Sequence, residues 1–181
     1  DCQEIYDMIV SLSANLRYTI KGGELVRLQE ELDYVDRYIL LQKTRLGGRL
    51  EVTKKINPKV NLAVIPKISI QMLVENAIIH GMPENGAVLH IIIRVCMENN
   101  RLLISVYDDG KGILPEKVKE LNDIFSGKSA DTGNSIGLPN LASRLKILYQ
   151  GEAGLFLESQ GDQFTEVKME LPIRKRENEN V

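Results

Sequence analysis

The chain has 181 residues, of which 43% are hydrophobic and 27% charged, a composition typical of a globular protein rather than a disordered or fibrous one. A formal net charge of -2 gives no electrostatic reason to expect nucleic acid as a partner. The two cysteines, Cys2 and Cys96, form no closely spaced pair, which argues against a disulfide scaffold or a zinc site and favours the reducing cytosol.

No apolar run in the sequence is long enough to cross a bilayer, because charged residues such as Lys67 and Arg94 interrupt each candidate. There is no recognisable signal peptide. The chain begins at Asp1, within a helical pattern. We therefore expect a piece of a longer protein, with any signal-sensing or membrane-anchoring part outside this sequence.

Two helices are predicted over the first 48 residues. Between residues 1 and 20, apolar side chains recur at steps of three and four, which places them on one helical stripe. A second helical pattern extends from Glu24 to Leu46, where a pair of glycines ends it. Charged residues such as Glu31 are expected on its outer faces. Its apolar face is expected to carry Leu25, Leu28, Leu32, Val35, Ile39 and Gln42.

After the second helix the pattern changes to short strands and helices. Helices are predicted from Pro66 to about Gly81, with the proline in the first turn, over 115–125, and over 138–149. The strands are predicted over 49–56, 87–97, 101–108, 153–159 and 164–171. Short turns between strands favour an α+β fold, a two-layer α/β sandwich with helices on one face of a mixed sheet. A doubly wound fold would alternate strands and helices strictly.

Three segments carry candidate chemistry, and the first is residues 73–81, within the helix predicted from Pro66. In this helix Asn76 and His80 lie at i and i+4 and therefore face the same way. Taken alone, the pattern also fits a helix whose polar residues are exposed to solvent, with His80 favoured near the C-terminus by the helix dipole.

The second segment runs from Val106 to Ile113. Asp108 ends an apolar strand, and Gly110 and Gly112 follow it at alternate positions. The glycines allow the backbone to approach a flat ligand closely, and the carboxylate can accept a hydrogen bond from it. An Asp-Gly pair is also a common hairpin signal, but no returning strand follows Gly112.

The third segment, residues 133–140, is a glycine-containing loop that leads directly into a helix. Free backbone N–H groups at a helix N-terminus suit phosphate oxygens. A flexible loop before a capped helix would give the same pattern, so this segment carries little weight by itself.

In this order, the three segments resemble the GHKL nucleotide-binding fold of type II topoisomerases, mismatch-repair ATPases, a heat-shock chaperone and histidine kinases. The flanking segments are similar to those of LytS/YesM-like sensor kinases: residues 12–18 to the second dimerisation helix, and residues 38–45 to the signature linker. The runs at 75–81 and 140–145 continue the resemblance, which extends through Pro172.

The resemblance implies roles for single residues. Asn76 would coordinate the Mg²⁺ that bridges the ATP phosphates. Asp108 would accept a hydrogen bond from the exocyclic amine of adenine. Glu75 and His80 are the candidates for a catalytic proton transfer. The other residues expected to contact ATP are Gly110, Gly112, Ile113, Gly133, Gly137, Leu138 and Thr165.

The sequence departs from the family near the phosphates. Ile79 stands where relatives often carry a lysine, and Met72 where a further polar residue can occur. Asn140 and Arg144 are interpreted as structural or phosphate-facing, without a choice between the two. These departures leave the phosphate contacts open, whereas adenine recognition is expected to be intact.

The implied function is that of an ATP-dependent protein-histidine kinase, acting as a homodimer and passing its phosphoryl group to the receiver domain of a response regulator. The acceptor histidine is expected upstream, since neither His80 nor His90 is a credible acceptor. The fragment is expected to face the cytoplasm, to bind no nucleic acid, and to belong to a parent protein anchored in the bacterial membrane. The expected domains are the end of a dimerisation hairpin (1–22), a linker helix (23–48), an ATP-binding domain (49–174) and a disordered tail (175–181).

Two other kinds of function stay open. One is a different enzyme, either an ATP-hydrolysing switch of the topoisomerase or chaperone kind or a serine kinase. Against the first, the residue four positions before Asn76 is Met72, which cannot act as a base. The two N-terminal helices argue against the second. The other kind is a catalytically silent ATP-binding or dimerisation module.

Overall fold

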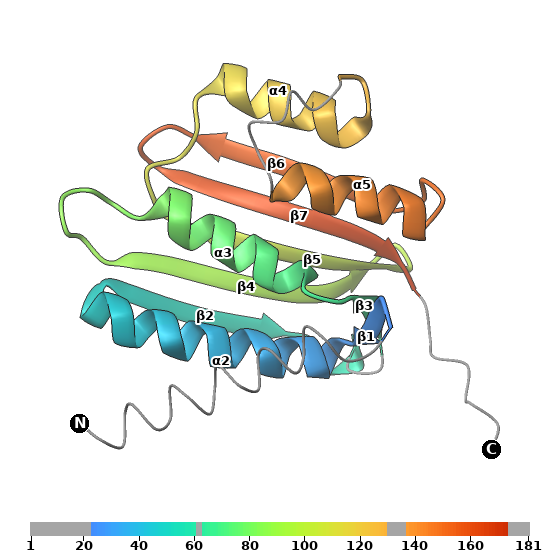
Figure 1. Cartoon of the computed structure of the whole chain (residues 1–181), viewed down its shortest axis with the longest axis horizontal. Coiled ribbons are helices and arrows are strands. Elements are labelled where there is room, and N and C mark those ends of the chain that lie inside the picture. The colour runs from blue at the N-terminus through green and yellow to red at the C-terminus, as the bar shows by residue number, and fades with distance from the viewer. Residues whose placement is uncertain (1–22, 61–62, 130–136, 174–181) are drawn as a thin grey trace.

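The computed structural model describes residues 23–60, 63–129 and 137–173. The helix predicted over 1–20, the loop residue Gly133 and the expected tail lie outside this range. The described part consists of a five-stranded sheet with helices packed on one face and a two-stranded ribbon beside it (Figure 1). None of its helices combines the length and apolar character needed to span a membrane.

The elements follow the predicted order, with the addition of two short strands that together form the ribbon. The strands are β1 (Leu25–Arg27), β2 (Leu50–Ile56), β3 (Val64–Pro66), β4 (Leu89–Glu98), β5 (Arg101–Asp108), β6 (Gly154–Gln160) and β7 (Phe164–Pro172). The helices are α2 (Leu28–Leu46), α3 (Ser69–Gly81), α4 (Pro115–Ser126) and α5 (Leu138–Leu148), with 3-10 turns at Gly47–Arg49 and Pro58–Val60.

The main sheet is mixed, as predicted. Its strand order is β2-β4-β5-β7-β6, with β2 parallel to β4 and every other neighbouring pair antiparallel. A two-residue turn joins β4 to β5, and its residues Asn99 and Asn100 both adopt a positive φ, which matches the right-handed twist of a hairpin. The turn therefore fixes which side chains of the two strands face the same way.

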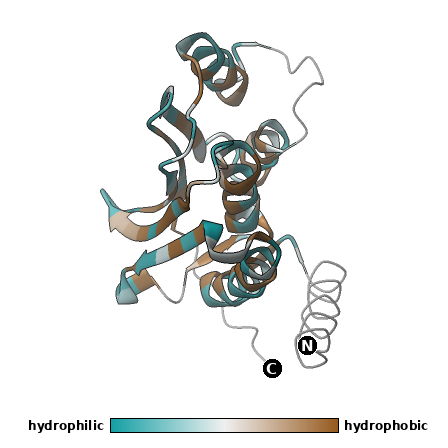
Figure 2. Ribbon diagram, turned by 90° about the vertical axis from the view of Figure 1, so that its left-hand side faces the viewer, coloured by the Kyte–Doolittle hydropathy of each residue, from teal (hydrophilic) through white to brown (hydrophobic). Residues whose placement is uncertain are grey.

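The hydrophobic core lies between the sheet and the helices (Figure 2). Alternate residues of the strands are buried on the helix side, as the period of two requires. These alternate side chains of β4 and β5 are all buried: Leu89, Ile91, Ile93, Val95, Leu102, Ile104 and Val106. Leu28 and Val35 of α2 are fully buried in the same core. The helix after the N-terminal segment is thus packed on the sheet rather than standing apart from it.

Two helix starts are predicted wrongly from the sequence. The helix expected from Glu24 begins only at Leu28, because the residues between pair with β3 as strand β1. The helix expected from Pro66 begins at Ser69, because Pro66 is the last residue of β3. Between them Ile68 adopts a left-handed conformation, with φ 66°, which turns the chain from strand to helix.

The prediction for Glu31 is also wrong, because this residue lies inside the protein rather than on an outer face of its helix. Its side chain has no exposed surface. Its carboxylate oxygens accept hydrogen bonds from the backbone N–H groups of Ile68 and Ile70, at 2.8 and 3.1 Å. A buried carboxylate needs such partners, because an unpaired charge away from water is costly.

Candidate functional site

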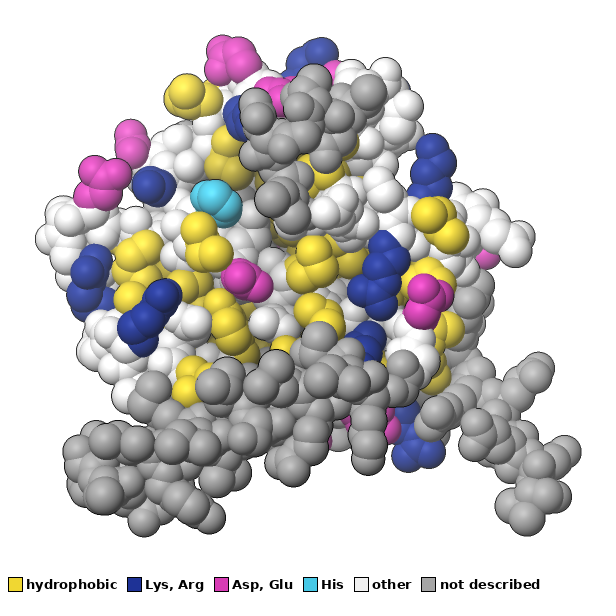
Figure 3. Space-filling view, in the orientation of Figure 1, with side chains coloured by type: hydrophobic (Ala, Val, Ile, Leu, Met, Phe, Trp, Pro, Cys, Tyr) yellow, Lys and Arg dark blue, Asp and Glu magenta, His cyan; other side chains and the backbone are white. Residues whose placement is uncertain are grey.

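A cavity of about 760 Å³ lies between α3, the start of α5, and the segment that follows β5. This volume is in the range of cofactor sites. On the face of the molecule that carries these helices, hydrophobic side chains are exposed among charged ones (Figure 3). The lining residues are Met72, Glu75, Asn76, Ile79, His80, Lys111, Gly112, Ile113, Lys117, Leu121, Gly137, Leu138, Pro139, Asn140 and Leu157.

The cavity brings together predicted site residues from all three motif segments. Helix α3 contributes Glu75, Asn76 and His80. The segment after β5 contributes Gly112 and Ile113. The start of α5 adds the last two, Gly137 and Leu138. Segments that are far apart in the sequence therefore meet around one hollow.

Three predicted residues, Asp108, Gly110 and Thr165, do not line the cavity but lie behind its wall. Asp108 at the end of β5 pairs directly with Thr165 of β7, and both side chains are buried. The Thr165 hydroxyl lies 3.1 Å from Ser159 Oγ, which accepts a hydrogen bond from the Ile113 N–H at 2.8 Å. Thr165 is thereby connected through Ser159 to a residue of the cavity wall.

The carboxyl group of Asp108 is close to balance between its charged and neutral forms at neutral pH. Burial raises its pKa to about 7, against the opposing effect of a hydrogen bond from the Gly110 N–H at 3.1 Å. The charge of Asp109 raises the pKa further. A strongly shifted carboxyl group beside a cavity is a frequent mark of a functional site. A ligand donor that reached this carboxylate would stabilise the charged form.

Gly110 and Gly112 are required by contacts within the protein. A Cβ atom on Gly110 would lie 2.1 Å from the carbonyl oxygen of Gly81, at the end of α3. One on Gly112 would lie 2.0 Å from the carbonyl oxygen of Gln160, and Gly112 also has a φ of 61°. The segment after β5 is therefore wedged between α3 and the β6–β7 turn. The sequence predicts that these glycines allow the backbone to approach a ligand closely. In the structure they allow it to approach other backbone of the protein.

Asp109, unlike Asp108, makes its side-chain contacts with His90 of β4. Its Oδ1 accepts a hydrogen bond from the backbone N–H of His90 at 2.7 Å, and its Oδ2 lies 2.7 Å from His90 Nδ1. His90 thus contacts the second aspartate of the pair and not the first.

Glu75 lies between the cavity and helix α2. Burial raises the pKa of Tyr38, on α2, to about 12, and the negative charge of Glu75 contributes to that rise. The second proton-transfer candidate, His80, is exposed at the last turn of α3. Both are thus near the cavity, on opposite sides of Asn76 in the sequence.

Two lysines of the cavity wall are not predicted from the sequence. Lys111, between the two glycines, has its Nζ 3.6 Å from Glu84 Oε1, and Lys117, in the first turn of α4, has its Nζ 2.8 Å from Glu120 Oε1. Exposed lysines carry no motif of their own, which explains the omission. Their positions, inside one motif segment and four residues after it, are the only sequence signal. Two cations at the rim suit an anionic ligand.

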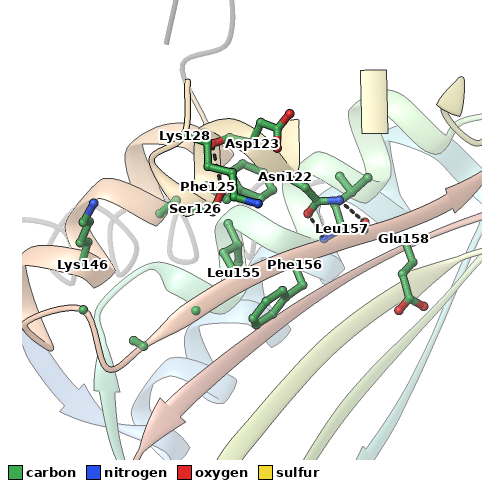
Figure 4. A pocket seen from close by; sticks show the side chains of 14 residues that line it. Asn122, Asp123, Phe125, Ser126, Lys128, Lys146, Leu155, Phe156, Leu157 and Glu158 are labelled. Carbon is green, nitrogen blue, oxygen red and sulfur yellow. Dashed lines mark hydrogen bonds between the residues drawn. The ribbon is translucent and has the colours of Figure 1, made fainter. Parts of the chain in front are cut away.

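A second cavity, of about 540 Å³, lies between α4, the end of α5 and β6 (Figure 4). Lys128, Lys146, Phe125 and Phe156 are among its lining residues. On its wall the side chain of Asn122 donates to the carbonyl oxygen of Leu157 at 2.8 Å and accepts from its N–H at 2.9 Å. None of the predicted site residues lines this cavity, so the first cavity is the candidate site.

Comparison with known proteins identifies the family. Residues 66–175 match the histidine kinase-, DNA gyrase B- and HSP90-like ATPase family, and residues 1–50 match the histidine kinase family. The chain is 27% identical to the sensor protein LytS of Bacillus anthracis over 183 residues, which cover 100% of this chain and 31% of LytS. It is 38% identical to the sensor histidine kinase YpdA of Escherichia coli over 146 residues, which cover 78% of this chain and 24% of YpdA. The chain belongs to the histidine kinase-, DNA gyrase B- and HSP90-like ATPase family, and within it to the LytS-like sensor histidine kinases.

Solved structures confirm the α+β sandwich predicted from the sequence. The catalytic domain of the histidine kinase ThkA superposes with a TM-score of 0.58 at 18% identity, covering 84% of this chain and 96% of that domain. Full-length ShkA in complex with AMPPNP gives a TM-score of 0.58 at 13% identity, covering 95% of this chain and 36% of ShkA. The chain spans about a third of the length of the LytS relatives that it matches.

Proposed function

We propose that the chain binds ATP with Mg²⁺ in this cavity and transfers the γ-phosphoryl group to a histidine of a sensor kinase, from which it passes to an aspartate of a response regulator. One observation carries the proposal: Asn76, Gly112 and Gly137, from three distant motifs, line a single cavity of nucleotide size. The family to which the chain belongs, and its LytS and YpdA relatives, support this reading.

The residues present fit such a ligand. Apolar side chains, among them Met72 and Leu121, suit the adenine ring, and Lys111 and Lys117 suit the phosphates. Among the described residues no three His, Cys, Asp or Glu side chains converge on a metal site. Mg²⁺ usually needs only one or two protein ligands beside phosphate oxygens, so the Asn76 amide oxygen is sufficient as the protein's contribution. When bound, ATP supplies the transferable phosphoryl group.

The assignment of single residues continues the sequence prediction. Asp108 is proposed to accept a hydrogen bond from the adenine amine, with Thr165 beside it. Glu75 is our candidate for moving a proton during transfer, because it lines the cavity one residue before Asn76. We propose no proton transfer by His80, which we assign to the cavity wall.

The arrangement of the whole kinase is part of the proposal. Residues 1–22 are proposed to complete a dimerisation hairpin, 23–48 to form the linker, and 49–174 to form the ATP-binding domain. In a homodimer of this kind, the histidine that receives the phosphoryl group lies on the dimerisation hairpin. The protein's contribution to transfer is positioning and neutralisation of charge on the phosphates.

Phosphotransfer can be tested directly. We expect the chain, given radiolabelled ATP and Mg²⁺, to place acid-labile phosphate on a separately supplied dimerisation hairpin of a LytS relative that carries its histidine. Asn76→Ala should lower the rate by about a hundredfold or more, since a catalytic metal contributes several kcal/mol to transition-state stabilisation. The matched control is the hairpin with its histidine changed to glutamine.

The same assay separates the alternatives. Inorganic phosphate without labelled hairpin would indicate an ATPase. Binding without either product would indicate a silent module. Acid-labile label on the chain itself would implicate His80 or His90 and contradict the assignment of both.

Adenosine affinity should depend on pH in a defined direction. The pKa of Asp108 is raised to about 7 in the free protein, and an amine that donates to the carboxylate would lower it in the complex. Binding therefore favours the deprotonated form, and affinity should fall roughly three- to tenfold as the pH drops from 8 to 6. Adenosine is the probe because, unlike ATP, it has no phosphate that titrates in this range.

Calorimetry in two buffers with different ionisation enthalpies checks this directly, because binding near pH 7 should release protons. The variant Asp108→Asn should bind with no such pH dependence. Adenosine that binds more tightly at pH 6 than at pH 8 would contradict the role of the carboxylate.

A further inference from the structure

We propose that Glu31 is a positioning residue for the nucleotide site: it caps α3 from α2 and thereby fixes the helix that presents Asn76. The inference rests on the proposed function, because Asn76 is assigned there to Mg²⁺. Glu31 is buried, does not line the cavity, and belongs to none of the three motif segments.

The contacts of Glu31 are those of a helix cap supplied from another helix. Its Oε2 accepts from the Ile68 N–H at 2.8 Å, and its Oε1 accepts from the N–H groups of Ile70 and Gln71 at 3.1 and 3.4 Å. These three groups belong to the beginning of α3, whose first N–H groups have no partner within the helix. A carboxylate there is favoured both by the hydrogen bonds and by the positive end of the helix dipole.

Helix α3 has no local substitute for this cap. Its N-cap residue is Ile68, whose aliphatic side chain cannot accept a hydrogen bond. The next side chain, Ser69, donates its hydroxyl to the carbonyl oxygen of Pro66 at 2.6 Å. Ile68 also holds a left-handed conformation that a β-branched residue rarely adopts, so the surrounding contacts must fix it. The start of α3 is consequently determined by a residue 37 positions earlier.

The capped end of α3 is close to the part of the helix that lines the cavity. Asn76 follows Gln71 by five residues, which is about 7.5 Å along a helix. Farther along, α2 meets α3 again where Tyr38 lies beside Glu75. Helices α2 and α3 are thus joined at two levels, one at the cap and one at the cavity, and a shift of α2 relative to the sheet would carry Asn76 with it.

The opposite wall of the cavity is connected to the same region. Arg144 of α5 donates to the carbonyl oxygens of Lys67 and Glu24, at 2.6 and 3.1 Å. The Lys67 N–H in turn donates to the Glu24 carbonyl oxygen at 2.9 Å. In Figure 1, β1 and β3 lie together at the end of the molecule where α2 and α3 begin. The region around β1 and β3 therefore contacts both α3 and α5, two of the helices that line the cavity.

The test compares Glu31→Gln with Glu30→Gln, which removes the same charge from the exposed neighbouring position of α2. Affinities are measured for adenosine, for ADP, and for ADP with Mg²⁺. We expect Glu31→Gln to bind adenosine as tightly as the wild type does. The factor by which Mg²⁺ raises the affinity for ADP should be about ten times smaller in this variant than in the wild type, which is the size of a typical coupling between sites. Glu30→Gln should match the wild type, and Glu31→Asp should recover part of the loss.

A merely structural role would give a different result. Loss of folded protein would lower adenosine and Mg²⁺-dependent affinity in parallel, and that outcome would overturn the proposal. An unchanged Mg²⁺ gain in folded Glu31→Gln would overturn it as well.

Amide hydrogen exchange tests, without any nucleotide, whether Glu31 caps α3. In Glu31→Gln the amides of Ile70 and Gln71 should exchange about tenfold faster than in Glu30→Gln, since local opening governs protection. Equal exchange in the two variants would refute the cap. If the wild type bound neither adenosine nor ADP, the proposed function would fail, while the exchange result would still decide the role of Glu31.

Discussion

Asp108→Ala should lower the affinity for ATP about ten- to a hundredfold, because a hydrogen bond to a charged group contributes roughly 1.5–3 kcal/mol. Asp108 is 2% exposed and lies at the end of β5, so water cannot replace the lost acceptor easily. At pH 8, where the Asp108 carboxyl group is mostly charged, GTP should bind the wild type poorly, because its carbonyl oxygen would face the carboxylate without a proton between them. Nucleotide titration, with circular dichroism to verify folding, measures both effects.

Asp109→Asn is the matched control, and the structure explains why it should be mild. The Asp109 carboxylate accepts from the His90 backbone N–H on the far side of the segment, and an amide oxygen can accept the same bond. We expect nucleotide affinity within about threefold of the wild type, as for a substitution outside the site. If Asp109→Asn were damaging and Asp108→Ala silent, the assignment of the motif would be wrong by one residue.

Asp108→Asn adds a readout on the free protein. Because the folded-state pKa of Asp108 is raised to about 7, its contribution to stability is present below the unfolded value and is lost as the pH rises through 7. The asparagine variant carries no such charge, so above pH 7 it should be more stable than the wild type, by roughly 1–4 kcal/mol, and at pH 4 it should not. Urea unfolding at the two pH values measures the difference. A wild type that gains stability over the variant between pH 4 and pH 8 would contradict the raised pKa.

Gly110→Ala should destabilise the fold by about 3 kcal/mol or more, because overpacking against backbone cannot be relieved by a rotamer change. The added Cβ would lie 2.1 Å from the carbonyl oxygen of Gly81 and 2.5 Å from its Cα. To make room, the end of α3 would have to move away from the segment after β5. Urea unfolding measures the loss, and nucleotide affinity should fall with it, since both elements contribute to the cavity.

The control for this change is Gly48→Ala, where an added Cβ meets no atom within 4 Å. Both variants make the same chemical change and alter the unfolded chain in the same way, so their difference reports the folded-state contact. Gly48→Ala should stay within about 0.5 kcal/mol of the wild type. Equal effects of the two substitutions would show that the contact between Gly110 and Gly81 does not constrain the fold.

Local patterns in the sequence are sufficient to predict the sheet and most helices. The buried faces of β4 and β5 follow from alternation, and the Asn99-Asn100 turn follows from residues that tolerate a positive φ. Strand β1 could not be found this way, because Leu25 and Leu28 also fit a helical spacing. What makes Leu25–Arg27 a strand is its partner β3, about forty residues later. Glu31 is buried for the same reason, since its partners are remote.

The site is predictable to the extent that its residues belong to motifs. Asn76, Gly112 and Gly137 line the cavity as the motifs suggest. The lysines at its rim have no distinguishing pattern and could not be anticipated. The reason for Gly110 could not be read from the sequence either, because it depends on the approach of Gly81 in three dimensions. Which residues contact ATP stays a prediction, and the Asp108 and Asn76 variants test it.

The paired hydrogen bonds between Asn122 and Leu157 have a consequence for self-association. Strand β6 is an outer strand of the sheet, and an outer strand offers unpaired N–H and C=O groups to any other extended chain. The amide of Asn122 occupies both such groups of Leu157, as the backbone of a further strand would. Helix α4 thereby closes this edge against strand addition, and the opposite edge, β2, carries the charged Lys54 and Lys55. Both margins of the sheet are thus protected from the edge-to-edge growth that leads to fibrils.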